Sequence, residues 1–396
     1  MVVTAQRPRY CGLAAVVAVA TLVVGAATVD AQGRRRSRLP PPKPSTLLLP
    51  AEPAWTVTLP ESQSAPAVAA DRVAVVPLAS GELHAFDWET GEARWVFGFA
   101  TTIAPAFAGN LVVAADAQVI EAVDAGTGKS VWRHSVSSAP TQLTGTATAL
   151  YFLDATGITA LDAATGREVW ASSTDGRPGL VAVGPYGVAV TQADDRVMLF
   201  AAADGRRRWV RQLLGMLRAP AWAGDTLVVP SSERTVWALD ADDGSIKWEW
   251  TLGGAVVGVA GDADRVYIAG LDNVLRGVNR DNGHQRWQQA LSTRAQLAPI
   301  GLDGAVLVAG LSPPLTLFNT LTGAAIGTHL ATAGLVGTPL VDRTVHPGRV
   351  AIVIALHDGR LIGLRSVALQ FREQPLTPLA LLPGRSLPRD RLPDVP

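Results

Sequence analysis

The hydrophobic positions of this chain come in short runs that are separated by polar turns rich in Gly, Asp and Pro. Residues 226–230 (Thr-Leu-Val-Val-Pro) and residues 235–239 (Thr-Val-Trp-Ala-Leu) are two such runs, with a polar turn between them. Runs of this length, rich in β-branched residues, are typical of β-strands and are too short for helices. The pattern therefore predicts an all-β fold.

One stretch of this pattern repeats along the chain. Residues 85–95 read Ala-Phe-Asp-Trp-Glu-Thr-Gly-Glu-Ala-Arg-Trp, and close copies occupy residues 122–132 and 160–170. The repeated tryptophans are Trp55, Trp95, Trp132, Trp170, Trp209, Trp248 and Trp287. From the second onward, each follows a turn glycine by four residues: Gly91, Gly128, Gly166, Gly205, Gly244 and Gly283. Consecutive tryptophans are 37 to 40 residues apart, a period typical of the four-stranded blades of a β-propeller.

The number of repeats predicts how the ring closes. A degenerate copy at residues 319–323 has Gly327 in the place of the next Trp, which gives eight positions with Trp55 as the first. The last period has no Trp strand, and Trp55 has no blade before it. We therefore predict an eight-bladed β-propeller of four-stranded antiparallel blades over residues 54–371, closed by the N-terminal strand joining the C-terminal blade. In each turn we expect Asp to accept backbone hydrogen bonds, Gly to adopt a positive φ, and Trp to dock between sheets.

The two ends of the chain differ from the repeat. Arg7 and Arg9 precede an apolar run at residues 11–29, so residues 1–31 are expected to be a signal peptide or an N-terminal membrane anchor. We interpret residues 32–53 as a basic and then Pro-rich linker, and residues 372–396 as a Pro-rich irregular tail. The protein is thus expected to be exported to the periplasm or envelope. Membrane contact is expected only through the N-terminal segment, if that segment is not cleaved.

Charge and candidate chemistry narrow the function. The chain has no formal net charge, with 34 basic and 34 acidic residues, so nucleic acid is not an expected partner. Its one cysteine, Cys11, lies in the apolar run, and the six histidines form no pair at metal-ligand spacing. Asp262 and Asp264 are expected in a hairpin turn. We predict no catalytic residue, no metal and no cofactor, and a monomeric propeller.

The repeat Ala-x-Asp-x-x-Thr-Gly-x-x-x-Trp resembles the tryptophan-docking motif of the PQQ-like β-propeller superfamily over roughly residues 55–371. This resemblance implies one of two functions. Quinoprotein dehydrogenases of the superfamily use pyrroloquinoline quinone (PQQ) and Ca²⁺, and many have an adjacent-cysteine pair, which this chain lacks. The BamB family comprises non-enzymatic scaffolds of the outer-membrane β-barrel assembly machinery, and its size and blade count are similar. We favour the scaffold; the alternative is a quinoprotein relative or a propeller that binds a ligand in its central channel.

The chain departs from the BamB family in places that matter for partner binding. It has no lipobox, and residues 172–180 and 251–255 match neither the Leu-x-Leu-Arg loop nor the Asp-x-Asp loop by which that family contacts its barrel partner. Another loop has the composition of an interface, with apolar and basic residues together. We predict that this loop binds a partner through Leu214, Met216, Leu217 and Arg218. The other interpretation is ordinary packing between blades, which burial of the three apolar side chains would indicate. The repeat leaves four tryptophans unassigned: Trp88, Trp222, Trp237 and Trp250.

Overall fold

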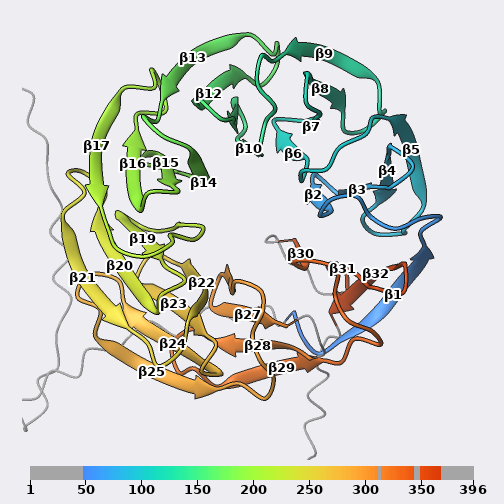
Figure 1. The fold of residues 1–396 in the computed structure, drawn as a ribbon. Helices are drawn as coiled ribbons and strands as arrows, with labels where there is room; N and C mark the ends of the chain where they lie inside the picture. The colour runs from blue at the N-terminus through green and yellow to red at the C-terminus, as the bar shows by residue number, and fades with distance from the viewer. Residues whose placement is uncertain (1–47, 311–313, 343–347, 367–396) are drawn as a thin grey trace, which may run out of the picture. The chain divides into compact units, whose positions relative to one another are not determined.

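The structure is a computed structural model that describes residues 48–310, 314–342 and 348–366. Within these residues, 32 strands form eight four-stranded antiparallel sheets, and there is no helix. The sheets follow one another around a central axis as the blades of a propeller (Figure 1). The predicted eight-bladed all-β fold is confirmed.

We number the blades in chain order, with the innermost strand first. Blade 1 comprises β2 (Val68–Ala70), β3 (Val73–Pro77), β4 (Glu82–Asp87) and β5 (Ala93–Gly98), and blade 2 comprises β6 (Ala106–Ala108), β7 (Leu111–Ala115), β8 (Val119–Asp124) and β9 (Ser130–Ser135). Blade 3 comprises β10 (Gln142–Gly145), β11 (Ala149–Leu153), β12 (Gly157–Asp162) and β13 (Glu168–Ser173), and blade 4 comprises β14 (Pro178–Gly184), β15 (Gly187–Gln192), β16 (Arg196–Phe200) and β17 (Arg207–Gln212). Blade 5 comprises β18 (Ala221–Ala223), β19 (Thr226–Pro230), β20 (Thr235–Asp240) and β21 (Ile246–Thr251), and blade 6 comprises β22 (Val256–Gly261), β23 (Arg265–Gly270), β24 (Val274–Asn279) and β25 (Gln285–Ala290). Blade 7 comprises β26 (Ile300–Leu302), β27 (Ala305–Ala309), β28 (Leu315–Asn319) and β29 (Ala325–His329), and blade 8 comprises β30 (Leu340–Val341), β31 (Val350–Ala355), β32 (Arg360–Ser366) and β1 (Ala51–Thr58).

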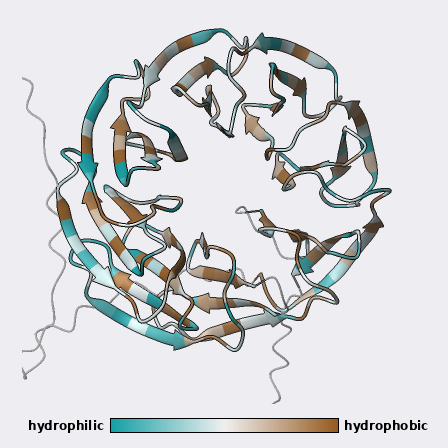
Figure 2. Cartoon of the chain, in the orientation of Figure 1, coloured by the Kyte–Doolittle hydropathy of each residue, from teal (hydrophilic) through white to brown (hydrophobic). Residues whose placement is uncertain are grey.

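The core lies between neighbouring blades rather than at the axis. The second strand of a blade is buried at all or all but one of its positions, and in β3 and β7 at every position, because both faces of its sheet are covered. The outermost strands instead alternate exposed and buried positions, with the docking Trp buried. Figure 2 shows the same division, with apolar residues concentrated on the middle strands and polar residues on the outer ones. One core cluster, for example, joins Val75 and Trp95 of blade 1 to Val112 of blade 2.

The ring closes through the N-terminal strand, as the number of repeats predicts. β1 pairs antiparallel with β32, from Ala51 opposite Ser366 to Thr58 opposite Arg360. The folded part begins before the expected end of the linker at residue 53, because Leu48 and Leu49 are already buried in the core between blades 7 and 8. Their apolar side chains fill the space beside Leu317 of blade 7.

The predictions for the chain ends fall mostly outside the described residues. Residues 1–47 and 367–396, which contain the expected signal peptide or anchor and the expected tail, are not described. Among the residues that are described, no helix has the length and apolar character needed to cross a membrane.

Candidate interaction site

The repeated tryptophans and glycines meet at the junctions between blades. Each of the seven indole Nε1 groups donates a hydrogen bond of 2.6 to 3.0 Å to a backbone carbonyl in the turn of the next blade. The ring lies over the glycine of that turn, and a Cβ on any of these glycines would come within 2.4 to 2.9 Å of the indole. Gly323, in the degenerate copy, receives Trp287 in the same way.

The acidic residues of these turns act as local structural groups. Asp124 Oδ1 accepts hydrogen bonds from the amide and the hydroxyl of Thr127, and Asp162 makes the same pair with Thr165. The hydrogen bonds from the threonine hydroxyls are the largest influence on the pKa of both aspartates, and they lower it below the ordinary 3.8. Asp262 accepts the amides of residues 264 and 265, which confirms the predicted hairpin turn.

A second set of contacts across the junctions could not be predicted from the Trp repeat alone. Two residues after the docking Trp, a side chain bonds the carbonyl of the neighbouring turn glycine at distances of 2.6 to 3.1 Å. The residues that do so are His134, Ser172, Arg211 and Trp250. The only sign of this contact in the sequence is a polar side chain two residues after the docking Trp. The carbonyl that it bonds can be identified only from the structure, because that carbonyl belongs to the next blade.

The remaining unassigned tryptophans are also structural. Trp88 is buried and donates to the Val350 carbonyl at 2.8 Å, so that it links blades 1 and 8. Trp222 donates to the Ala182 carbonyl of blade 4 at 3.3 Å, and Trp237 is buried in the core between blades 4 and 5.

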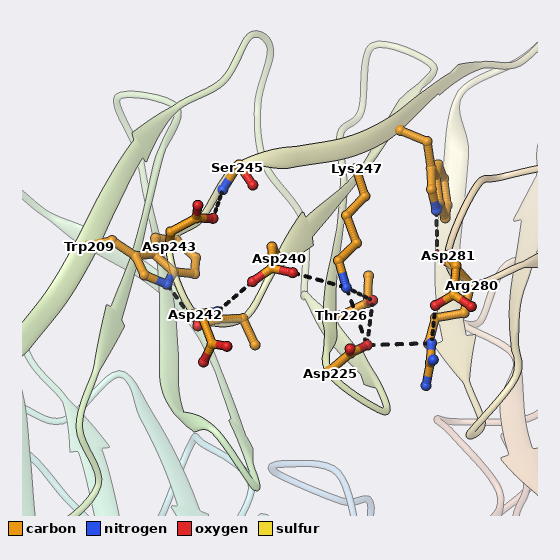
Figure 3. Close-up of polar contacts among 12 residues, drawn as sticks. Trp209, Asp225, Thr226, Asp240, Asp242, Asp243, Ser245, Lys247, Arg280 and Asp281 are labelled. Atoms are coloured by element: carbon orange, nitrogen blue, oxygen red, sulfur yellow. Dashed lines mark hydrogen bonds and ion pairs between the residues drawn. The ribbon is translucent and has the colours of Figure 1, made fainter.

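An ion-pair network joins blades 5 and 6 (Figure 3). Lys247 Nζ lies 3.3 Å from Asp225 and 3.2 Å from Asp240, and Arg280 Nε lies 3.4 Å from Asp225 and 2.8 Å from Asp281. Burial tends to raise the pKa of Asp225, but hydrogen bonds from Lys247 and a neighbouring hydroxyl lower it below 3.8 overall. These carboxylates face cations of the same network, an arrangement that holds the two blades together. In the described part of the chain, no group of three or more His, Cys, Asp or Glu residues could hold a metal ion.

The predicted partner-binding residues lie on the loop between β17 and β18, which we call the 213–220 loop. Leu214 and Met216 are 76% and 69% exposed, whereas Leu217 is half-buried against the core. Arg218 is exposed. Burial between blades, the other interpretation of this loop, therefore holds only in part for Leu217 and does not hold for Leu214 and Met216.

The 213–220 loop is anchored at both sides of its exposed residues. Leu213 is buried, and its amide donates to the Asp195 carbonyl at 2.9 Å. The Met216 carbonyl accepts the Ser232 amide, and the Arg218 amide donates to the Pro230 carbonyl, both at 2.8 Å. Gly215 has φ +84°, which places the exposed side chains before and after it without strain. The two apolar side chains are thus presented on an ordered backbone.

Leu214 has no large apolar counterpart at the same position of the other Trp-bearing repeats, although Leu330, which is 71% exposed, lies in the corresponding loop between β29 and β30. Five residues after the docking Trp, the other blades carry small, polar or cyclic residues: Pro60, Ala100, Ser137, Asp175, Gly253 and Ser292. The position of Leu214 in the repeat therefore does not require a large apolar side chain. Leu214 and Met216, exposed together on an ordered loop, make this loop a candidate protein-binding surface.

Eight blades, with an indole dock at seven of their junctions, define a tryptophan-docking β-propeller. The exposed apolar residues of the 213–220 loop give it a candidate protein-binding surface. The family model described as "Outer membrane protein assembly factor BamB" matches residues 50–157, 154–257 and 250–368, and the chain belongs to this family.

Solved structures share the fold at low sequence identity. BamB from Moraxella catarrhalis superposes with a TM-score of 0.61 at 17% identity, over 80% of this chain and 99% of that one. The computationally designed Ika8 protein gives 0.67 at 15% identity, over 78% and 98%. Sqt1 from Saccharomyces cerevisiae gives 0.67 at 9% identity, over 80% and 99%. No curated protein matches the sequence.

Proposed function

We propose that this protein is a non-catalytic scaffold of the cell envelope that binds a protein of the β-barrel assembly machinery through the 213–220 loop. Membership of the BamB family supports the setting. The observation that carries the choice of surface is the exposure of Leu214 and Met216 on a loop whose backbone is hydrogen-bonded on both sides. An ordered apolar surface loses little conformational entropy on binding, which favours affinity.

The one charged residue of the loop suits the same role. Arg218 is exposed next to the two apolar side chains, and arginine and methionine are both enriched at protein interfaces. Interface energy is concentrated in a few buried side chains, so we expect Leu214 and Met216 to be the main contributors.

The test is site-specific crosslinking in native envelopes. A photoreactive residue at position 214 should crosslink to a barrel-assembly component, identified by mass spectrometry. The double variant Leu214→Asp/Met216→Asp should then weaken binding to the purified component about tenfold or more, because it places two carboxylates in an apolar interface.

The matched control is Leu321→Asp. Leu321 is 57% exposed but lies in the β28–β29 turn, away from the 213–220 loop. Equal loss of binding in the control and the double variant, or a crosslink at position 214 to no assembly component, would contradict the proposed surface.

The proposal includes the absence of catalysis, and PQQ provides its test. PQQ carries three carboxylates, so a site for it requires cationic side chains. In the described part of the chain, the innermost strands of the eight blades contain no Lys, Arg or His, which supports a function without this cofactor. Dehydrogenase activity after reconstitution with PQQ and Ca²⁺ would overturn the non-catalytic assignment.

A further inference from the structure

A cavity of about 580 Å³ lies at the centre of the propeller. Six of the innermost strands contribute to its wall: β2, β14, β18, β22, β26 and β30. Its volume falls in the range of small-molecule sites, which is roughly 300–1,000 Å³. The cavity is separate from the 213–220 loop, since no residue of that loop lines it.

The described side chains that line this cavity are uncharged and mainly apolar, whereas the surface of the wall as a whole is about equally polar and apolar. Val183, Ile300, Leu340 and Val341 contribute branched side chains, and the other lining residues include Ala, Gly and Pro. Among the residues that the structure describes, none that lines the cavity is ionisable. A charged ligand would lose its hydration there without gaining an ion pair, so the wall favours a neutral ligand.

An aromatic pair stands at one side of the cavity. Trp222 lines it, and the rings of Trp222 and Tyr186 stack with centroids 6.1 Å apart and an interplanar angle of 23°. The indole lies close to the backbone of Gly184, where an added Cβ would come within 2.4 Å of it. An ordered indole in the wall of a cavity is suited to contact a flat ring.

The backbone adds the polar groups that such a site needs. Each innermost strand is the last in its sheet and pairs on one side only, so its other edge has N–H and C=O groups without a strand partner. Figure 1 shows these edges around the centre of the ring. They can bond the neutral polar atoms of a ligand while the side chains contact its apolar part.

We propose that the central cavity is a binding site for a neutral, mainly apolar small molecule with a flat ring. This inference is independent of the proposed scaffold function, because it concerns a different surface.

The test is a fluorescence titration of the purified full chain with N-phenyl-1-naphthylamine, a neutral apolar probe. We expect saturable binding of one probe per chain. Thr338 is exposed and lines the cavity, so Thr338→Glu places a carboxylate at the wall without disturbing the core. This change should weaken probe binding at least about tenfold, whereas Thr338→Val should not weaken it.

Two controls define the site and the ligand class. Thr102→Glu adds the same charge to an exposed threonine in the loop between β5 and β6, outside the cavity wall, and should leave binding unchanged. Trp222→Phe should reduce energy transfer from protein to bound probe. Probe binding that does not saturate, that ignores Thr338→Glu, or that is matched by an anionic naphthalene sulfonate would overturn the proposal.

Discussion

At the residue scale, the propeller depends on turn glycines at which no other residue type fits. Gly128 has φ +68°, and a Cβ there would lie 2.7 Å from the indole of Trp95. Both the backbone conformation and the flat approach of the indole therefore require the absence of a side chain. The repeat of Gly and Trp in the sequence reflects this paired requirement at each junction.

Replacing Gly128 by Ala should lower the free energy of unfolding by about 2–3 kcal/mol, because the new methyl group is strained and displaces the indole. Urea unfolding followed by tryptophan fluorescence measures the loss. Gly126→Ala in the same turn is the control, since its Cβ would make only an ordinary contact of 3.5 Å with Asp124. Equal losses in the two variants would show that the close approach of Trp95 is not the cause.

Sequence periodicity could predict these residues because each is repeated at one place in every blade. It could not assign Trp88, whose indole bonds the Val350 carbonyl in the last blade. That contact depends on which blades become neighbours after closure, and no local pattern encodes it. The contact of His134 with the Gly166 carbonyl in the next blade could not be assigned either, because it depends on how the two consecutive blades pack against each other.

At the scale of elements, the turns with Asp should make stability depend on pH. The pKa values of Asp124 and Asp162 are lower in the folded chain than their ordinary value of 3.8. The folded state therefore binds fewer protons than the unfolded state near this pH. Their contribution is present at neutral pH and is lost as the pH falls below about 4.

We expect the double variant Asp124→Asn/Asp162→Asn to be less stable than the parent at pH 7, with a difference in Tm that shrinks as the pH is lowered to about 3. Asn preserves the turn, as Asn279 and Asn319 already accept the equivalent amides in this chain. Thermal unfolding by circular dichroism across this pH range provides the measurement. Parallel curves for parent and variant would contradict the predicted linkage.

The 213–220 loop shows the limit of prediction for a single element. Its composition singles out the loop, but the adjacent residues Leu213 and Leu214 have opposite environments, one buried and one 76% exposed. The difference arises because the Leu213 amide is held by the Asp195 carbonyl of a neighbouring turn. The partner of that amide is not visible in the order of residues, although an apolar residue recurs four positions after the docking Trp, as in Leu252 and Leu291.

At the scale of the whole molecule, the junction between blades 7 and 8 differs from the other seven that the structure describes. Gly327 takes the place of the docking Trp, and an added Cβ there would lie 2.4 Å from the Leu49 carbonyl oxygen. His329 Nδ1 lies 3.1 Å from the Ala51 carbonyl oxygen, and Leu48 and Leu49 supply the buried apolar surface. The N-terminal segment therefore closes the ring in place of an indole.

Deleting residues 48–58 from the purified protein should lower Tm by more than about 10 °C, because it removes β1, the Trp55 dock and the buried leucines together. It should also promote self-association through the exposed edge of β32. Differential scanning calorimetry and size-exclusion chromatography measure the two effects. A shorter deletion that ends at residue 47 is the control and should leave Tm unchanged; an unchanged Tm in the longer deletion would contradict a closing role for β1.

The order of synthesis gives the pairing of β1 with β32 a further consequence. Since Ala51 pairs with Ser366, the first strand made must wait for one of the last before it gains its partner. Blades formed in between can stack on one another, but the nascent ring stays open until almost the entire propeller has left the ribosome. Throughout that delay β1 remains without the strand that it pairs with in the folded ring.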